Sequence, residues 1–162
     1  MKKYEFTGET KQIELLSRTA TLHRIRAVVE FGFVKVGDLG GWIEKEENLS
    51  HVGKAWVCGD AEVWGNAKVC GDAEVFSVNH ILVIGPAGSR SDFTTFFRDK
   101  DNEITVKCGC FLGKIDKFLE KVSRTHGDNK HALVYRAAVE VAKLQIDLTE
   151  EVSEESEDKS NE

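Results

Sequence analysis

The chain has 162 residues, 41% of them hydrophobic, which is enough for one domain or for a small repeat module with a compact partner domain. Its longest apolar run, residues 81–84, is too short to span a membrane, and charges directly after Met1 argue against a signal peptide, so we expect a cytosolic protein. Residues 149–162 carry the whole net charge of −6 and are expected to be disordered. Residues 1–148 hold 21 acidic and 21 basic side chains, and this balance excludes a broad basic surface for nucleic acid.

Residues 1–44 are predicted to form an N-terminal β cap. Residues 22–28 alternate apolar with polar side chains, which is typical of a half-buried strand, and residues 33–36 continue the β pattern. The glycines in residues 37–41 indicate tight turns that lead the chain into the next segment.

Residues 45–80 contain a six-residue repeat. Three hexads follow one another without a break in residues 57–74, with the consensus Val-x-Gly-(Asp/Asn)-Ala-x, and residues 51–56 precede them in register. Valine suits a short buried strand, alanine suits a crowded interior, and glycine followed by Asp or Asn suits a turn. The valines and alanines are therefore predicted to face inward, and the pattern has no helical period.

This repeat resembles the hexapeptide repeat of left-handed parallel β-helix proteins, in which three hexads complete one triangular coil. The resemblance implies a mainly β fold with about two coils over residues 45–80. So short a stack needs other structure to cover its ends. The entry GDLGGWIEKEENLS is also similar to that of small uncharacterised proteins of phages and mobile elements.

Residues 81–148 are predicted to form an α+β cap. Residues 81–84 look like a buried strand, residues 85–90 like a loop, and residues 93–98 and 103–108 like a hairpin. Apolar residues at helical spacing predict helices over residues 113–125 and 130–146. Segments in this region, including HILVIGPAGSR, resemble a block found in uncharacterised phage and mobile-element proteins.

Two groups of residues in this cap are candidates for binding. Gly85, Gly88, Ser89 and Arg90 follow a buried strand, where backbone N–H groups, a hydroxyl and a guanidinium can bind an anion; an ordinary turn is the alternative. We expect no cofactor and no metal, and the four cysteines are expected to be reduced thiols. The alternative is a zinc site, or a nucleophilic thiol with a histidine base, built from Cys108, Cys110, His126 and His131.

Two histidines and two tryptophans of the repeat region are the other candidates. The resemblance implies an acyltransferase as an alternative function, with His51 or His80 as general base, although a structural histidine at an imperfect coil is the simpler interpretation. Trp56 and Trp64 occupy hexad positions that should point outward, where another subunit, the C-terminal cap or a ligand would cover them. We favour a second subunit and so expect a homo-oligomer, and the resemblance implies a trimer.

These observations lead to a functional hypothesis. The protein is expected to be a non-enzymatic, oligomeric binding protein that captures a nucleotide-like molecule or a host protein, with no nucleic-acid or membrane partner. The resemblance to phage proteins suggests interference with a host defence pathway, in the host cytoplasm. The alternatives are the acyltransferase and a structural assembly protein without a ligand.

Overall fold

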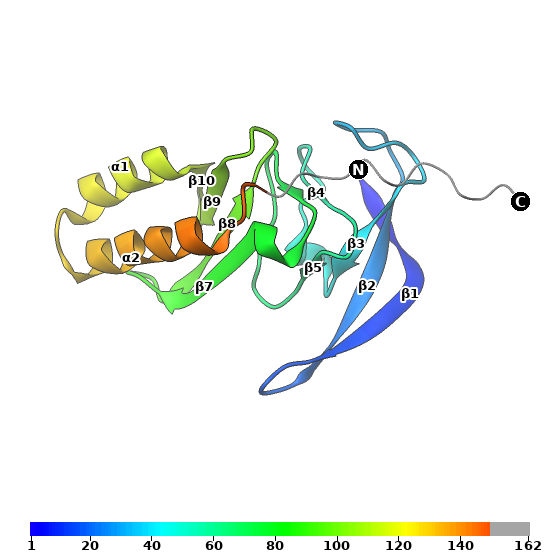
Figure 1. Cartoon of the computed structure of the whole chain (residues 1–162), viewed down its shortest axis with the longest axis horizontal. Helices are drawn as coiled ribbons and strands as arrows, with labels where there is room; N and C mark the ends of the chain where they lie inside the picture. Colours follow the sequence, from blue (N-terminus) through cyan, green and yellow to red (C-terminus); the bar gives the residue numbers. More distant parts are fainter. Residues whose placement is uncertain (150–162) are drawn as a thin grey trace, which may run out of the picture.

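The computed structural model describes residues 1–149, so the predicted disordered tail, residues 149–162, lies outside the described residues except for Thr149. Two units lie end to end, with the β1–β2 hairpin projecting from one of them (Figure 1). The first unit holds the N-terminal strands and the repeat, in five strands and a short 3-10 helix: β1 Tyr4–Glu14, β2 Thr19–Ala27, β3 Leu39–Ile43, η1 Glu46–Asn48, β4 Trp56–Val57, β5 Glu62–Val63. Strand β6, Glu74–Val75, completes it.

The second unit is an antiparallel sheet with two helices packed against it. Its strands are joined in the order β10-β9-β8-β7, and the short helix η2, Val78–His80, leads into the first of them. The bounds are β7 Ile81–Ala87, β8 Asp92–Arg98, β9 Ile104–Cys108, β10 Phe111–Lys114, α1 Ile115–His126 and α2 Lys130–Gln145. The predicted hairpin and both predicted helices are therefore confirmed.

The prediction of a left-handed parallel β-helix is wrong. The first sheet has the order β1-β2-β3-β5 and is antiparallel except between β3 and β5, and the second sheet is wholly antiparallel. The repeat contributes only the two-residue strands β4, β5 and β6. Strand β5 pairs in parallel with β3, which precedes the repeat, and β4 pairs in parallel with β6. The long hairpin of β1 and β2 takes the edge of β3, so antiparallel pairing dominates.

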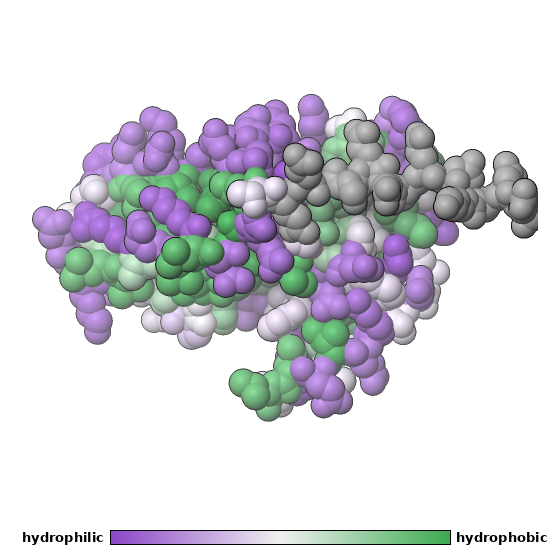
Figure 2. Space-filling model, viewed as in Figure 1, coloured by the Kyte–Doolittle hydropathy of each residue, from purple (hydrophilic) through white to green (hydrophobic). Residues whose placement is uncertain are grey.

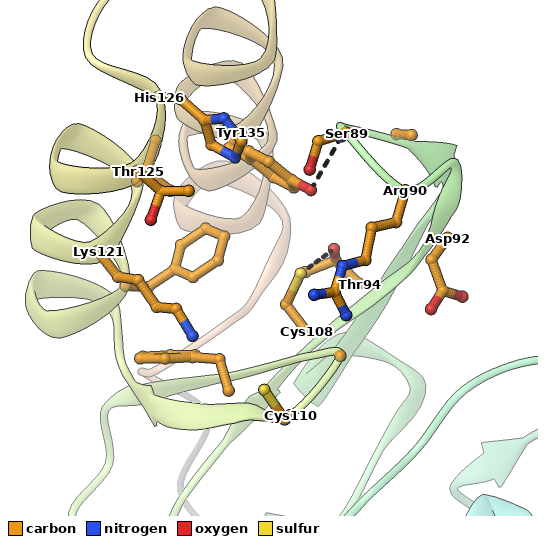
Figure 3. A pocket seen from close by; sticks show the side chains of 15 residues that line it. Ser89, Arg90, Asp92, Thr94, Cys108, Cys110, Lys121, Thr125, His126 and Tyr135 are labelled. Atoms are coloured by element: carbon orange, nitrogen blue, oxygen red, sulfur yellow. Dashed lines mark hydrogen bonds between the residues drawn. The ribbon is translucent and has the colours of Figure 1, made fainter.

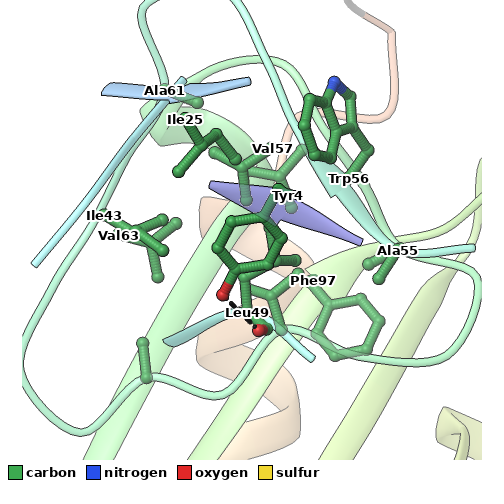
Figure 4. Close-up of a cluster of buried hydrophobic side chains, with 14 of the residues drawn as sticks. Tyr4, Ile25, Ile43, Leu49, Ala55, Trp56, Val57, Ala61, Val63 and Phe97 are labelled. Carbon is green, nitrogen blue, oxygen red and sulfur yellow. Dashed lines mark hydrogen bonds between the residues drawn. The ribbon is translucent and has the colours of Figure 1, made fainter. Parts of the chain in front are cut away.

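The inward positions of the repeat are nevertheless occupied as predicted. The valines and alanines at the consensus positions of residues 57–74 are buried, and Gly59, Gly65 and Gly71 have positive φ angles of 61–67° at the corners. Figure 4 shows the resulting core, in which Tyr4 from β1 fills the centre and its hydroxyl donates to the Leu49 carbonyl at 2.8 Å. The N-terminal strand is thus part of the core rather than a separate cap.

Strand β8 joins the two units because its neighbouring side chains point to opposite faces. Phe96 is buried against the helices, whereas Phe97 is buried in the core of the repeat. The sheet is therefore covered on one face by α1 and α2 and on the other by the repeat. None of the helices in residues 1–149 has both the length and the apolar character needed to cross a membrane.

Candidate functional site

A pocket lies in the second unit between α1, the turn that joins β7 to β8, and the turn that joins β9 to β10 (Figure 3). Its cavity volume is about 130 Å³, which suits a small ligand or one end of a larger one. The sheet places the two turns side by side, because β7, β8, β9 and β10 are successive antiparallel neighbours. Residues from four separate segments of the chain therefore meet here.

Two basic side chains border this pocket from opposite walls. Arg90 extends from the β7–β8 turn toward β9, and Lys121 extends inward from α1 (Figure 3). Within residues 1–149 neither side chain forms an ion pair with a carboxylate. Asp92 also lines the pocket, but its Oδ1 accepts the backbone N–H of Phe93 at 2.7 Å. The pocket therefore carries two cationic side chains that form no ion pair within residues 1–149, together with the carboxylate of Asp92.

Aromatic rings form the inner wall of the pocket. Phe111 and Phe118 lie 5.5 Å apart between ring centroids, and Lys121 Nζ lies 5.5 Å from the centroid of Phe111. Tyr135 from α2 packs edge-on against Phe118 at 5.7 Å, and its hydroxyl accepts the backbone N–H of Ser89 at 3.3 Å. The phenol retains its own hydrogen for donation to a ligand. This arrangement combines cations, donors and flat apolar surface.

The predicted thiols and one predicted histidine belong to the same pocket. Cys108, Cys110 and His126 all line it, and the Cys108 sulfur accepts a hydrogen bond from the Thr94 hydroxyl at 3.3 Å. His126 and His131 have ring centroids 5.5 Å apart, and His131 is not among the lining residues. Within residues 1–149, no group of three or more His, Cys, Asp or Glu side chains is placed to hold a metal ion, so these residues do not assemble the suggested zinc site.

The predicted anion-binding loop differs from its expected conformation. Gly85 belongs to β7, and only residues 88–91 form the turn. Ser89 and Arg90 line the pocket, and Gly88 packs against the ring of Tyr135. The N–H groups of Ser89 and Ser91 are already bonded within the protein, to Tyr135 and to the Gly88 carbonyl. Any anion would therefore be held by side chains rather than by a cradle of backbone N–H groups.

Neither predicted catalytic histidine reaches this pocket. His51 stacks on Tyr4 at 4.1 Å between centroids, and its Nδ1 accepts the backbone N–H of Lys3 at 3.1 Å. Burial lowers the pKa of His51, with Glu46 acting in the opposite direction. His80 is fully buried, and its Nδ1 accepts the backbone N–H of Phe76. Both rings connect segments of the core, which is the structural role that the sequence allowed as an alternative.

The two tryptophans have different environments. Trp56 is 2% exposed and packs against Tyr4 and Phe31 inside the core, so the prediction that it points outward to a second subunit is wrong. The physical reason is that β1 and the chain around Phe31 cover that side of the repeat. Trp64 is 42% exposed, in agreement with an outward orientation. Its role in an oligomer stays a prediction.

Sequence reasoning missed Lys121, Tyr135 and the two phenylalanines of the pocket. A signal for Lys121 was present, because Phe118, Lys121 and Thr125 follow one another at helical spacing and so share one face of α1. No such signal exists for Tyr135, whose place depends on how α2 packs.

Comparison with known proteins gives no match, either to protein-family models or to curated protein sequences. The resemblance to hexapeptide-repeat proteins of phages and mobile elements is therefore contradicted twice: by the antiparallel sheets and by the absence of a matching family.

Proposed function

We propose that this protein is a non-enzymatic binding protein that captures a small anionic molecule with a flat apolar part, such as a nucleotide-like compound. The observation that carries the proposal is the placement of Arg90 and Lys121 on opposite walls of one pocket, beside the ring of Phe111 and without an ion pair to any carboxylate within residues 1–149. A guanidinium and an ammonium bind phosphate oxygens strongly, and the partly exposed ring of Phe111 offers a surface on which a base can stack.

The chemistry of the pocket favours binding over catalysis. The only histidine in its lining, His126, stacks on Tyr135 with ring centroids 5.8 Å apart. The acyltransferase alternative needs a histidine base at the site, and both proposed bases are structural residues of the repeat. The role against host defence rested on a resemblance that the comparisons do not support, so the proposal is restricted to ligand capture.

The test is a titration of the full chain with inorganic phosphate, nucleoside mono-, di- and triphosphates, cyclic nucleotides and an uncharged nucleoside. We expect at least one phosphorylated compound, and not the nucleoside, to raise the melting temperature and to give a measurable Kd by calorimetry. In Arg90→Gln and Lys121→Gln, binding should weaken by about tenfold to a hundredfold, since a charged hydrogen bond is worth about 1.5–3 kcal/mol.

Lys117→Gln is the matched control, because it removes the same charge from the outer face of α1, where Lys117 is 72% exposed and pairs with Glu120. Binding should be unchanged in this variant. A chain that binds nothing in the panel, or that binds equally well after Arg90→Gln and Lys121→Gln, would refute the proposal.

A further inference from the structure

Helix α2 has two apolar stripes, and only one of them is covered. The inner stripe packs on the sheet and consists of Ala132, Tyr135, Val139, Ala142 and, just after the helix, Ile146. The outer stripe consists of Val134, Ala137, Val141 and Leu144. Of these, Val141 is 47% and Leu144 89% exposed, and neighbouring Leu133 is 59% exposed. A surface helix normally has a single apolar stripe, so the outer one needs an explanation.

Helix α1 shows that this feature is specific to α2. The exposed positions of α1 are occupied by charged and polar side chains, including Asp116, Lys117, Glu120 and Arg124. Both helices cover the same sheet, yet only α2 presents aliphatic side chains to solvent. Figure 2 shows hydrophobic side chains gathered over this helical part of the molecule.

The spacing of the outer stripe identifies the kind of surface that fits it. Successive members are separated by three, four and three residues, which is the spacing of the seam along which one α-helix packs on another. Small Ala137 lies near the middle, with the larger Val134 and Leu144 on either side. A second helix with the same pattern would therefore fit this face, and this chain itself supplies one.

We propose that the outer face of α2 pairs with the same face of a second copy of this chain, with the two helices antiparallel. In this arrangement Ala137 of one copy faces Val141 of the other, and Val134 faces Leu144, so small and large side chains alternate along the seam.

The charges at the ends of α2 favour the antiparallel orientation. Lys130 at the start of one helix comes opposite Asp147, just beyond the end of the other, and the helix dipoles oppose one another. A parallel pair would place Lys130 beside its own counterpart. Glu140, which lies near the two-fold axis, is paired with Lys143 of the same helix at 3.5 Å, so its charge is already balanced.

Two hydrogen bonds fix the chain directly after α2 to the rest of the protein. The backbone N–H of Asp147 donates to the Asn79 carbonyl, and the Asn102 side chain donates to the Leu148 carbonyl at 2.8 Å. A single pair of helices of this length, about 24 Å, is smaller than a standard protein interface. The dimer should therefore be reversible, with a mass that rises with concentration.

The test measures the mass of the full chain by analytical ultracentrifugation from micromolar to several hundred micromolar concentration. We expect a rise from the monomer mass of 18.1 kDa to twice that value. Val141→Glu and Leu144→Glu should each keep the chain monomeric throughout that range, with an unchanged far-UV spectrum. Leu144→Glu cannot disturb the core, since the side chain is 89% exposed.

Leu16→Glu provides the matched control, because Leu16 is an equally aliphatic and fully exposed residue at the tip of the β1–β2 hairpin. This variant should dimerise like the unchanged chain. A chain that stays monomeric at all concentrations, a trimer, or a dimer that persists in both α2 variants would overturn the proposal.

Discussion

Asn48 is the side chain whose removal should weaken the repeat most directly. It is fully buried, and its Nδ2 donates to the carbonyl oxygens of Gly65 at 3.1 Å and Ala67 at 3.0 Å. Its Oδ1 accepts the backbone N–H of Lys45 at 3.0 Å. These bonds connect the short helix η1 to a later turn of the chain, so one amide holds two layers of the repeat together.

Replacing Asn48 by alanine leaves two carbonyl oxygens and one N–H group without this partner. A buried polar group that loses its partner costs about 1–3 kcal/mol, and the less buried groups at Gly65 and Lys45 can turn to water. We therefore expect Asn48→Ala to lower the free energy of unfolding by about 2–4 kcal/mol. At about 2–4 °C per kcal/mol for a chain of this size, the melting temperature should fall by about 5–15 °C.

The assay is urea and thermal unfolding followed by circular dichroism. Asn79→Ala is the matched control, because Asn79 is exposed and only its backbone bonds to other residues of the described chain. That variant should stay within about 0.5 kcal/mol of the unchanged protein. Equal stability of Asn48→Ala and Asn79→Ala would show that the buried amide does not hold the layers together.

Three further predictions follow from other buried groups. Burial lowers the pKa of Lys3 from its ordinary 10.5 to about 8. Between these values the unfolded chain binds more protons than the folded chain, so the free energy of unfolding should rise with pH across that window. Urea unfolding at pH 7.5 and 9.5 should show this rise in the unchanged chain but not in Lys3→Met. Burial also lowers the pKa of His51, so stability should decrease as pH falls below 6.5, and His51→Asn should reduce this dependence in melts at pH 7.5 and 5.5. A Cβ at Gly88, whose φ is 78°, would lie 2.1 Å from the Tyr135 hydroxyl. Gly88→Ala should therefore lower the free energy of unfolding in urea by about 2–4 kcal/mol. Gly127→Ala should lower it by only about 1 kcal/mol, because no atom lies within 4 Å of a Cβ at that position.

Local periodicity predicted the parts of the fold that depend on burial alone. The hexads placed Val57, Val63 and Val69 inside, and they are buried at 0–1% exposure. Helical spacing placed α1 and α2 within two residues of their observed bounds. These features follow from which side of an element faces water, and a single sequence carries that information.

The pairing of strands was not predictable in the same way. A hexad determines where a turn lies and which residues face inward, but not which strand occupies each edge. Strand β1 was overlooked, and its pairing with β2 makes the first sheet mostly antiparallel. Asn48 shows the same limit, since its hexad position is otherwise an exposed turn residue, as at Asp60, whereas the short helix η1 turns its side chain inward.

Some residues of the pocket could be recognised from the sequence, but the way in which they come together could not. Ser89, Arg90, Cys108 and Cys110 were recognised as two separate candidates, because each pair is close in sequence. Their meeting depends on β7 and β9 flanking β8, which places the turns after β7 and β9 at one end of the sheet. Lys121 then completes the site from α1. Such a site is a property of topology, which the spacing of motifs alone does not contain.

Helix α2 has two faces with different roles. Tyr135 and Val139 lie on the inner face, where Tyr135 reaches the pocket and Val139 packs on the sheet, whereas the stripe around Val141 faces solvent. Because 3.6 residues complete a turn, positions four apart share a face and adjacent positions do not. Consequently Leu144→Glu changes the outer face without touching the pocket, and Lys121→Gln changes the pocket without touching the outer face. Ligand binding and self-association can therefore be tested, and can fail, independently.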